Sequence, residues 1–135
     1  MSELTVPAAI EQLSAVHSFV NDKLEACPHK ERVQIETAVE EIFVNIARYA
    51  YHPQTGNVTI RCKAEDGSVA IQFLDRGVPF NPLSREDADT TLSAEARNIG
   101  GLGILMVKGI MDVVDYAYTD STNILTIKKS WQAEK

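Results

Sequence analysis

The sequence predicts an α+β protein in which helices cover one face of an antiparallel-rich sheet. Two patterns predict it: apolar residues recur every three or four positions up to residue 50, and every second position from residue 58. A third observation is Asp66-Gly67 between two alternating segments, which is a strong β-hairpin signal. With 135 residues, the chain has the length of one domain, expected to span residues 1–135.

Two amphipathic helices are expected in the first half, after a short edge strand at residues 4–6. The first helix follows Pro7 and stops before Cys27-Pro28, because the residue before a proline disfavours helix. The second runs from about residue 30 to residue 50. Its apolar stripe consists of Ile35, Val39, Ile42, Ile46 and Tyr49. As part of this stripe, Tyr49 is expected to point toward the packed side.

The second half is expected to supply most of the strands. Residues 58–62 and 69–73 alternate around Asp66-Gly67 and form the first hairpin. Residues 113–118 and 124–128 form a second hairpin around a polar turn. Residues 100–111 have a helical pattern despite their glycines, whereas residues 83–98 are polar with little periodicity.

Composition and charge exclude several classes of function. The chain is 44% hydrophobic and 24% charged, which is typical of a globular protein. No apolar run reaches the ~18–20 residues of a membrane-spanning helix. Thirteen Lys and Arg against nineteen Asp and Glu give a net charge of −6, which repels nucleic acids and anionic lipid surfaces. We therefore expect neither a direct nucleic-acid partner nor a membrane partner.

The N-terminus and the cysteines favour a cytoplasmic location. Residues 1–6 contain no basic segment followed by an apolar stretch, so no secretory signal is visible. Cys27 and Cys62 lie far apart and form no C-x-x-C motif, which argues against a disulfide framework or a thiolate zinc site. Both are expected to be small core residues.

The first motif that could carry chemistry is on the second predicted helix. Glu41 and Asn45 are four residues apart and share a helix face, and Arg48 falls within the same arc. A carboxylate there could orient or deprotonate a nucleophile, and an Asn carbonyl oxygen suits Mg²⁺. Taken alone, the motif is equally typical of a solvated helix face.

The second motif, residues 75–80, directly follows a predicted strand. Asp75 could accept a hydrogen bond from an exocyclic amine such as that of adenine. Gly77 permits close approach of a ligand, and Pro79 stiffens the loop. Because Asp, Gly and Pro are common turn residues, a plain turn explains this motif by itself.

The third motif is Gly100-Gly101-Leu102-Gly103, at the start of a predicted helix. Glycine-rich backbone at a helix N-terminus presents unpaired N–H groups to an anion such as phosphate. The spacing matches neither a dinucleotide-binding fingerprint nor a P-loop. A flexible loop that leads into a helix is the plainer interpretation of this motif alone.

In this order, Glu41-x-x-x-Asn45, Asp75-x-Gly77-x-Pro79-Phe80 and Gly100-Gly101-Leu102-Gly103 resemble the Asn box and the two Gly boxes of the GHKL (Bergerat-fold) ATPase superfamily. Residues 75–82 and 100–107 are similar to the stand-alone anti-sigma-factor serine/threonine kinases, the RsbW/SpoIIAB-like group. The resemblance spans residues 30–130. It implies a two-layer α/β sandwich, with a mixed, mostly antiparallel sheet that helices cover on one face.

The resemblance also implies roles for individual residues. Asp75 would accept a hydrogen bond from the adenine amine of ATP, and Gly77 would let the base approach. Asn45 would bind the Mg²⁺ that bridges the phosphates. Gly101 and Gly103 would hold the phosphate chain with their backbone N–H groups.

Glu41 would act as general base toward a serine or threonine hydroxyl, since phosphoryl transfer needs mainly positioning and charge neutralisation. Residues 84–98 would form a lid over ATP, from which Arg97 could reach phosphate. The implied nucleotide-binding set is completed by Arg48, Pro79, Phe80, Gly100 and Leu102.

The implied function is that of an ATP-binding anti-sigma factor with serine/threonine kinase activity. Its implied partners are a sigma factor and a STAS-domain anti-sigma-factor antagonist, which it would phosphorylate. The alternative is a non-catalytic module that sequesters a sigma factor and uses ATP as a conformational ligand. Relatives in this group often pair through the first strand and helix, which implies a possible homodimer.

Other branches of the superfamily fit the sequence less well. A histidine-kinase catalytic domain would need an attached dimerisation helix pair, for which 135 residues leave little room. ATPases like MutL or the heat-shock chaperones would need further domains. At one position the chain departs from the group: family members often have His where this sequence has Tyr49.

Overall fold

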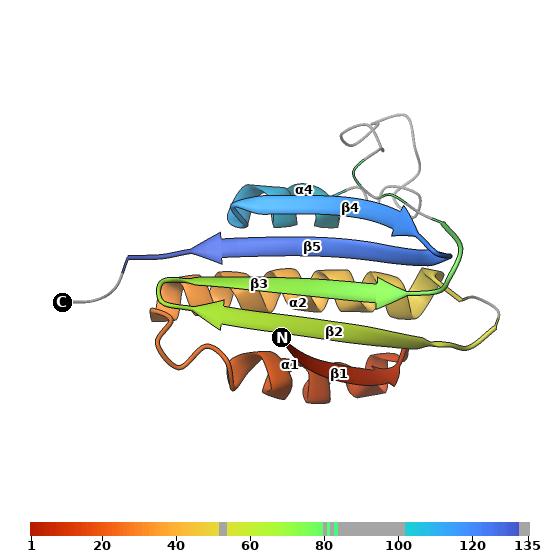
Figure 1. Ribbon diagram of the computed structural model, residues 1–135, viewed down its shortest axis with the longest axis horizontal. Coiled ribbons are helices and arrows are strands. Elements are labelled where there is room, and N and C mark those ends of the chain that lie inside the picture. The colour runs from red at the N-terminus through yellow and green to blue at the C-terminus, as the bar shows by residue number, and fades with distance from the viewer. Residues whose placement is uncertain (52–53, 80, 82, 84–101, 133–135) are drawn as a thin grey trace.

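A sheet and a layer of helices make up the computed structural model, which describes residues 1–51, 54–79, 81, 83 and 102–132 (Figure 1). In chain order the elements are β1 (Ser2–Pro7), the 3-10 turn η1 (Ile10–Gln12), α1 (Leu13–Asn21), α2 (His29–Tyr49), β2 (Asn57–Glu65), β3 (Ser68–Asp75), α4 (Leu102–Ile110), β4 (Val113–Thr119) and β5 (Thr122–Ser130). The expected edge strand, two long helical segments, two hairpins and glycine-rich helix are thus all present.

The five strands form one sheet in the order β1-β2-β3-β5-β4. All four neighbouring pairs are antiparallel, so the described sheet is antiparallel throughout rather than mixed. α1, α2 and α4 lie on one face of this sheet (Figure 1). The α+β architecture with helices on one face is therefore confirmed. No helix in the described ranges is both long and apolar enough to cross a membrane.

The inner face of the sheet is apolar along most of its length. On β3, every second residue from Val69 onward is buried, as the alternating sequence predicts. The buried core residues of the central strands are Val58, Ile60, Cys62, Val69, Ile71, Phe73, Leu125 and Ile127. Ile35, Val39 and Phe43 of α2 belong to the same core cluster. Both cysteines are free and buried, and burial raises the pKa of the Cys62 thiol to about 11.

The last inward row of the sheet carries two polar residues, Asp75 and Asn123, next to the apolar Val58 and Val6. Asp75, at the end of β3, pairs in register with Val58 on β2 and with Asn123 on β5. In the described part of the chain, Asp75 and Asn123 are the only polar or charged residues that are buried, at 7% and 6% exposed. Because burial of polar groups costs free energy unless they are paired, this row distinguishes one end of the sheet from the rest.

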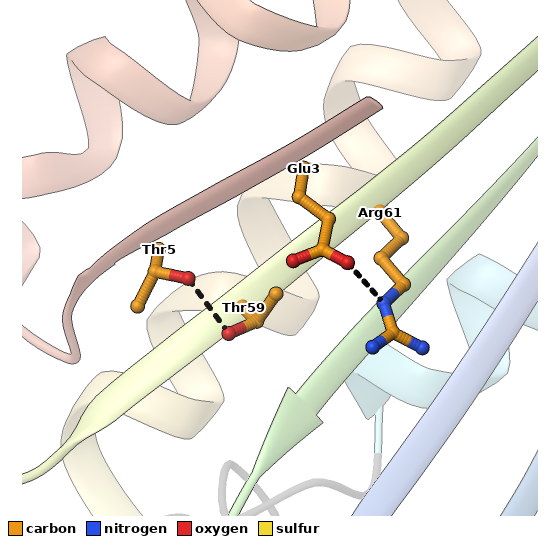
Figure 2. Close-up of polar contacts among 4 residues, drawn as sticks. All are labelled: Glu3, Thr5, Thr59 and Arg61. Carbon is orange, nitrogen blue, oxygen red and sulfur yellow. Dashed lines mark hydrogen bonds and ion pairs between the residues drawn. The ribbon is translucent and has the colours of Figure 1, made fainter. Parts of the chain in front are cut away.

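The outer face of the sheet carries polar pairs between β1 and β2. The Thr5 and Thr59 hydroxyls lie 2.9 Å apart, and Arg61 Nε donates to Glu3 Oε2 at 3.0 Å (Figure 2). Both pairs follow from the register, which sets these residues opposite each other. Exposed ion pairs of this kind contribute at most about 1 kcal/mol. The outer face is therefore solvated along β1 and β2, while Val6 of β1 is buried on the inner face.

Residues with positive φ make both hairpin turns. Gly67 has φ 79° in the β2–β3 turn, where the Asp66-Gly67 sequence predicts it. In the β4–β5 turn, Asp120 and Ser121 have φ 52° and 60°, although neither is glycine. The second turn therefore has the backbone of a tight hairpin without the residue that adopts it most readily.

The expectation for Tyr49 was wrong, because its side chain is 39% exposed. The apolar residues of α2 stay on one face of the helix, but they become less buried toward its C-terminal end. Ile35 and Val39 are fully buried, and Ile46 is only partly buried. Tyr49 is the last residue of α2. The periodicity therefore predicted the correct face, but the core ends before the helix does.

Candidate functional site

Glu41 and Asn45 lie on one face of α2 and contact each other. Asn45 Nδ2 donates to Glu41 Oε1 over 3.5 Å, and both residues are half-buried. The donation occupies the amide nitrogen of Asn45, so its carbonyl oxygen is the atom suited to a hard cation such as Mg²⁺. Arg48, one turn further along, is exposed.

The first turn of α4 packs against this pair. A Cβ atom on Gly103 would overlap the carboxylate of Glu41 and would lie 2.9 Å from its Cγ. Glycine at this position therefore lets α4 begin directly beside the carboxylate. A helix N-terminus has unpaired N–H groups and is the positive end of the helix dipole. It therefore stabilises negative charge, both that of the Glu41 carboxylate and that of an anionic ligand.

Asp75 ends β3 and is fixed by two hydrogen bonds. Its Oδ1 accepts from Gly77 N at 2.9 Å and from Asn123 Nδ2 at 3.0 Å. Burial raises the pKa of the Asp75 carboxyl above its ordinary value of 3.8, and the bonds from Asn123 and Gly77 oppose that rise. The side chain is thus a buried acceptor, held in one orientation at the end of the strand.

The loop after Asp75 packs against the C-terminal end of α2. Val78 N donates to the carbonyl oxygen of Ala50 at 3.0 Å. A Cβ on Gly77 would lie 2.6 Å from the carbonyl carbon of Ala50, so only glycine permits this approach. Tyr51 joins the same corner, because its hydroxyl accepts from Arg76 N at 2.7 Å and donates to Asn57 O at 2.6 Å.

Two polar clusters, one around Glu41 and Asn45 and the other around Asp75 and Gly77, therefore lie along one helix. Gly103 contacts α2 at Glu41, and Gly77 contacts it at Ala50. Nine residues separate these points, which is about 13 Å along a helix at 1.5 Å per residue. In Figure 1 the end of β3, the β4–β5 turn and the C-terminal end of α2 lie at the same end of the molecule, on the right.

Asn123 and Tyr116 also belong to this corner, although no sequence motif pointed to them. Tyr116 Oη donates to Asn123 Oδ1, and Asn123 Nδ2 also donates to Val78 O at 3.0 Å. The available signal was alternation: inward positions of β5 are Asn123, Leu125 and Ile127, so an amide stands where the pattern requires an apolar residue. Such an interruption at a strand end predicts a polar network.

Not every predicted site residue can be placed. Pro79 is exposed beside Val78, and Leu102 is the first residue of α4. Phe80, Arg97, Gly100 and Gly101 lie outside the described residues, as does the expected lid at residues 84–98. Within the described ranges, no group of three or more His, Cys, Asp or Glu side chains could hold a metal ion.

Comparison with known families and proteins gives a consistent result. The family described as "Histidine kinase-like ATPase domain" matches residues 6–129. The serine-protein kinase RsbW of Listeria monocytogenes serovar 1/2a is 24% identical over 99 residues, which cover 70% of this chain and 63% of that protein. The serine-protein kinase RsbW of Bacillus cereus (strain ATCC 10987) is 22% identical over 140 aligned positions, which cover 93% of this chain and 82% of the relative.

A solved structure shares the fold. The Acinetobacter baumannii histidine kinase AdeS superposes with a TM-score of 0.52 at 17% sequence identity, over 98% of this chain and 70% of that chain. The match to the Listeria kinase spans less than two thirds of that relative. The structural likeness therefore establishes the fold of this chain, and the sequence matches establish its relatives.

Proposed function

The chain belongs to the histidine kinase-like ATPase domain family, and on this basis we propose that it is an ATP-dependent protein serine/threonine kinase. The observation that carries the proposal is that both glycine-containing segments pack along α2, one at Glu41 and the other at Ala50, which caps the C-terminal end of the helix. An extended ligand with a base at one end and phosphates at the other fits two polar clusters about 13 Å apart on one helix. The relatives named serine-protein kinase support the same class of reaction.

The adenine end of this site is the corner formed by Asp75 and Gly77. A buried carboxylate that is held by two donors on Oδ1 can accept a further hydrogen bond from an exocyclic amine. At the position of the 6-amino group of adenine, guanine has a carbonyl oxygen. Two acceptors would then face each other, so guanine would bind the Asp75 carboxylate less favourably. Asp75 therefore selects adenine over guanine.

The phosphate end is the corner formed by Glu41, Asn45 and the start of α4. Asn45 would offer its amide oxygen to Mg²⁺, a hard cation that usually takes only one or two ligands from the protein. When bound, Mg²⁺ neutralises charge on the phosphates. The N-terminus of α4 favours the same negative charge.

Glu41 is the general base. It accepts the proton of a serine or threonine hydroxyl while the hydroxyl oxygen forms a bond to the γ-phosphorus of ATP. The bond from that phosphorus to the β–γ bridging oxygen breaks, and ADP leaves. The side-chain amide of Asn45 donates a hydrogen bond to the Glu41 carboxylate, and this bond keeps the proposed base next to the proposed cation ligand.

The substrate we propose is a serine or threonine of a STAS-domain anti-sigma-factor antagonist, and the second partner is a sigma factor. Both follow from the resemblance of the three motifs to the RsbW/SpoIIAB-like group. Similarity to serine-protein kinases supports the class of acceptor.

Transfer of labelled phosphate from ATP to STAS proteins tests this function, with wild type compared against Glu41→Gln. The glutamine keeps the shape of the side chain and removes its basicity, so transfer should fall about 10²-fold or more while ATP still binds. Glu40→Gln is the matched control, because Glu40 is adjacent, exposed and paired with His17 at 3.5 Å. Equal transfer by wild type and Glu41→Gln would remove Glu41 from the mechanism. If the chain binds ATP but transfers phosphate to none of the STAS proteins, the result would favour the alternative function, a non-catalytic module that sequesters a sigma factor.

A further inference from the structure

The polar end of the sheet contains two side chains, Tyr116 and Asn123, to which the proposed function assigns no role. Tyr116 Oη donates to Asn123 Oδ1, and Asn123 Nδ2 donates to Asp75 Oδ1 at 3.0 Å. The three residues come from β4, β5 and β3, so the chain of bonds crosses three neighbouring strands. It ends at the residue that is proposed to read adenine.

The bonds orient the amide of Asn123. Because the Tyr116 hydroxyl donates to the carbonyl oxygen, the NH₂ group must face the opposite way, toward Asp75 and the loop. One amide hydrogen then meets Asp75 Oδ1, and the other meets Val78 O at 3.0 Å, with Gly77 O at 3.4 Å. Asn123 therefore fixes both the Asp75 carboxylate and the backbone of the loop that follows it.

The same bonds decide which oxygen of Asp75 faces a ligand. Among the described residues, Gly77 N and Asn123 Nδ2 both donate to Oδ1. With Oδ1 occupied by two protein donors, Oδ2 is the oxygen offered to an amine. A carboxylate that lost its Asn123 partner could rotate about χ2 and would present either oxygen, since that torsion is soft.

The stability of the fold does not by itself explain why an amide side chain stands at position 123 of β5. Asn is depleted in strands, and the other inward residues of β5, Leu125 and Ile127, are apolar. A buried polar pair contributes less to folding than apolar residues of similar volume, unless every group is satisfied. The polar row therefore indicates a requirement beyond packing.

We infer that Asn123, oriented by Tyr116, is a positioning residue that sets the preference of this site for the 6-amino group of adenine. The inference rests on the proposed nucleotide-binding function. It assigns to β4 and β5 a role in ligand selection, although the three sequence motifs lie on other segments.

The test compares affinities for Mg-ATP and for Mg-purine riboside triphosphate, which lacks the 6-amino group, by calorimetry on the full chain. Wild type should bind ATP more tightly. Asn123→Ala should lose about tenfold in ATP affinity and less than about threefold in affinity for the analogue, so the ratio of the two affinities falls. A loss of structure alone would weaken both nucleotides alike and leave the ratio unchanged, and that result would overturn the inference.

Two further variants keep the test decisive if Asn123→Ala does not fold. Tyr116→Phe removes only a hydroxyl, and it should lower the affinity ratio by about two- to fivefold. Tyr118→Phe makes the same change two residues along β4, on a side chain that is 44% exposed, and should leave the ratio unchanged. A ratio that Tyr116→Phe leaves at the wild-type value would overturn the inference.

Failure of the proposed function would look different from failure of the inference. If wild type itself binds neither nucleotide, or binds both equally, the adenine site is wrong and the inference falls with it. If wild type discriminates and both Asn123→Ala and Tyr116→Phe discriminate equally well, the site stands and only the positioning role is wrong.

Discussion

Gly103 and Gly109 lie in the same helix, α4, but their backbones face different surroundings. A Cβ on Gly103 would meet the Glu41 carboxylate, whereas a Cβ on Gly109 would meet nothing within 4 Å. The obstacle at Gly103 is the far end of a flexible side chain. The fold can therefore accept a methyl group there, but only by moving Glu41.

Gly103→Ala should separate activity from stability. The displaced Glu41 carboxylate should lower kcat/KM for phosphate transfer about tenfold or more, because a small misplacement of a positioned group is costly. Gly109→Ala is the control, and it should raise the free energy of unfolding by about 1 kcal/mol without changing kcat/KM. Unchanged transfer by Gly103→Ala would show that Glu41 need not occupy its present position.

The buried carboxyl of Asp75 leads to a prediction of how the stability of the fold depends on pH. Burial raises the pKa of its carboxyl above 3.8, so the folded chain binds this proton more tightly than the unfolded chain. The contribution of this group to stability is therefore fully present below pH 3.8 and is lost as the pH rises through the folded-state pKa. At neutral pH, the ionised carboxylate is a cost to the fold.

Asp75→Asn should accordingly raise the melting temperature at pH 7, and the difference from wild type should vanish as the pH approaches 3. The same variant should lose its preference for ATP over GTP. Asp115→Asn, at an exposed position on β4, is the control and should change neither property. A lower melting temperature for Asp75→Asn at pH 7 would mean that the bonds from Asn123 and Gly77 outweigh the cost of burial.

Among the elements, the β4–β5 hairpin has a turn that its residues do not favour. Ser121 has φ 60°, a conformation that costs a non-glycine residue about 1 kcal/mol or more. Ser121 lies two residues before Asn123, so this turn leads into the polar end of the sheet.

Ser121→Gly should therefore stabilise the chain by about 0.5–1 kcal/mol in urea unfolding at pH 7, because glycine adopts positive φ without strain. The matched variant is Ser68→Gly, at the first residue of β3, which should destabilise because Ser68 does not have positive φ and glycine only adds conformational freedom to the unfolded chain. A Ser121→Gly protein that is less stable than wild type would show that the hydroxyl or the stiffness of Ser121 matters more than its φ.

The elements themselves could be predicted from the sequence, because their signals are local. Helical periodicity predicted α2, and Asp66-Gly67 predicted the first hairpin. Tyr49 could not be predicted, because its exposure depends on where the core ends. Asn123 could not be assigned a partner, because Asp75 is 48 residues away and only the strand register brings the two together.

At the scale of the whole molecule, the sheet and helices form an apolar body with one polar end. The inner face is apolar from Val69 to Phe73 and becomes polar at Asp75, beside the C-terminal end of α2. The outer face carries solvated pairs such as Thr5 with Thr59 (Figure 2). We propose that the 135 residues act as a single nucleotide-binding domain whose ligand lies along α2.

Amide chemical shifts on titration with Mg-ATP test this central claim most directly. We predict that the largest changes occur at Gly77, Gly103 and the side-chain amide of Asn45, with little change at Thr5 and Thr59. Changes at only one of the two glycines would contradict a ligand that spans both clusters. Changes confined to the outer face of the sheet, or no changes at all, would contradict the nucleotide site itself.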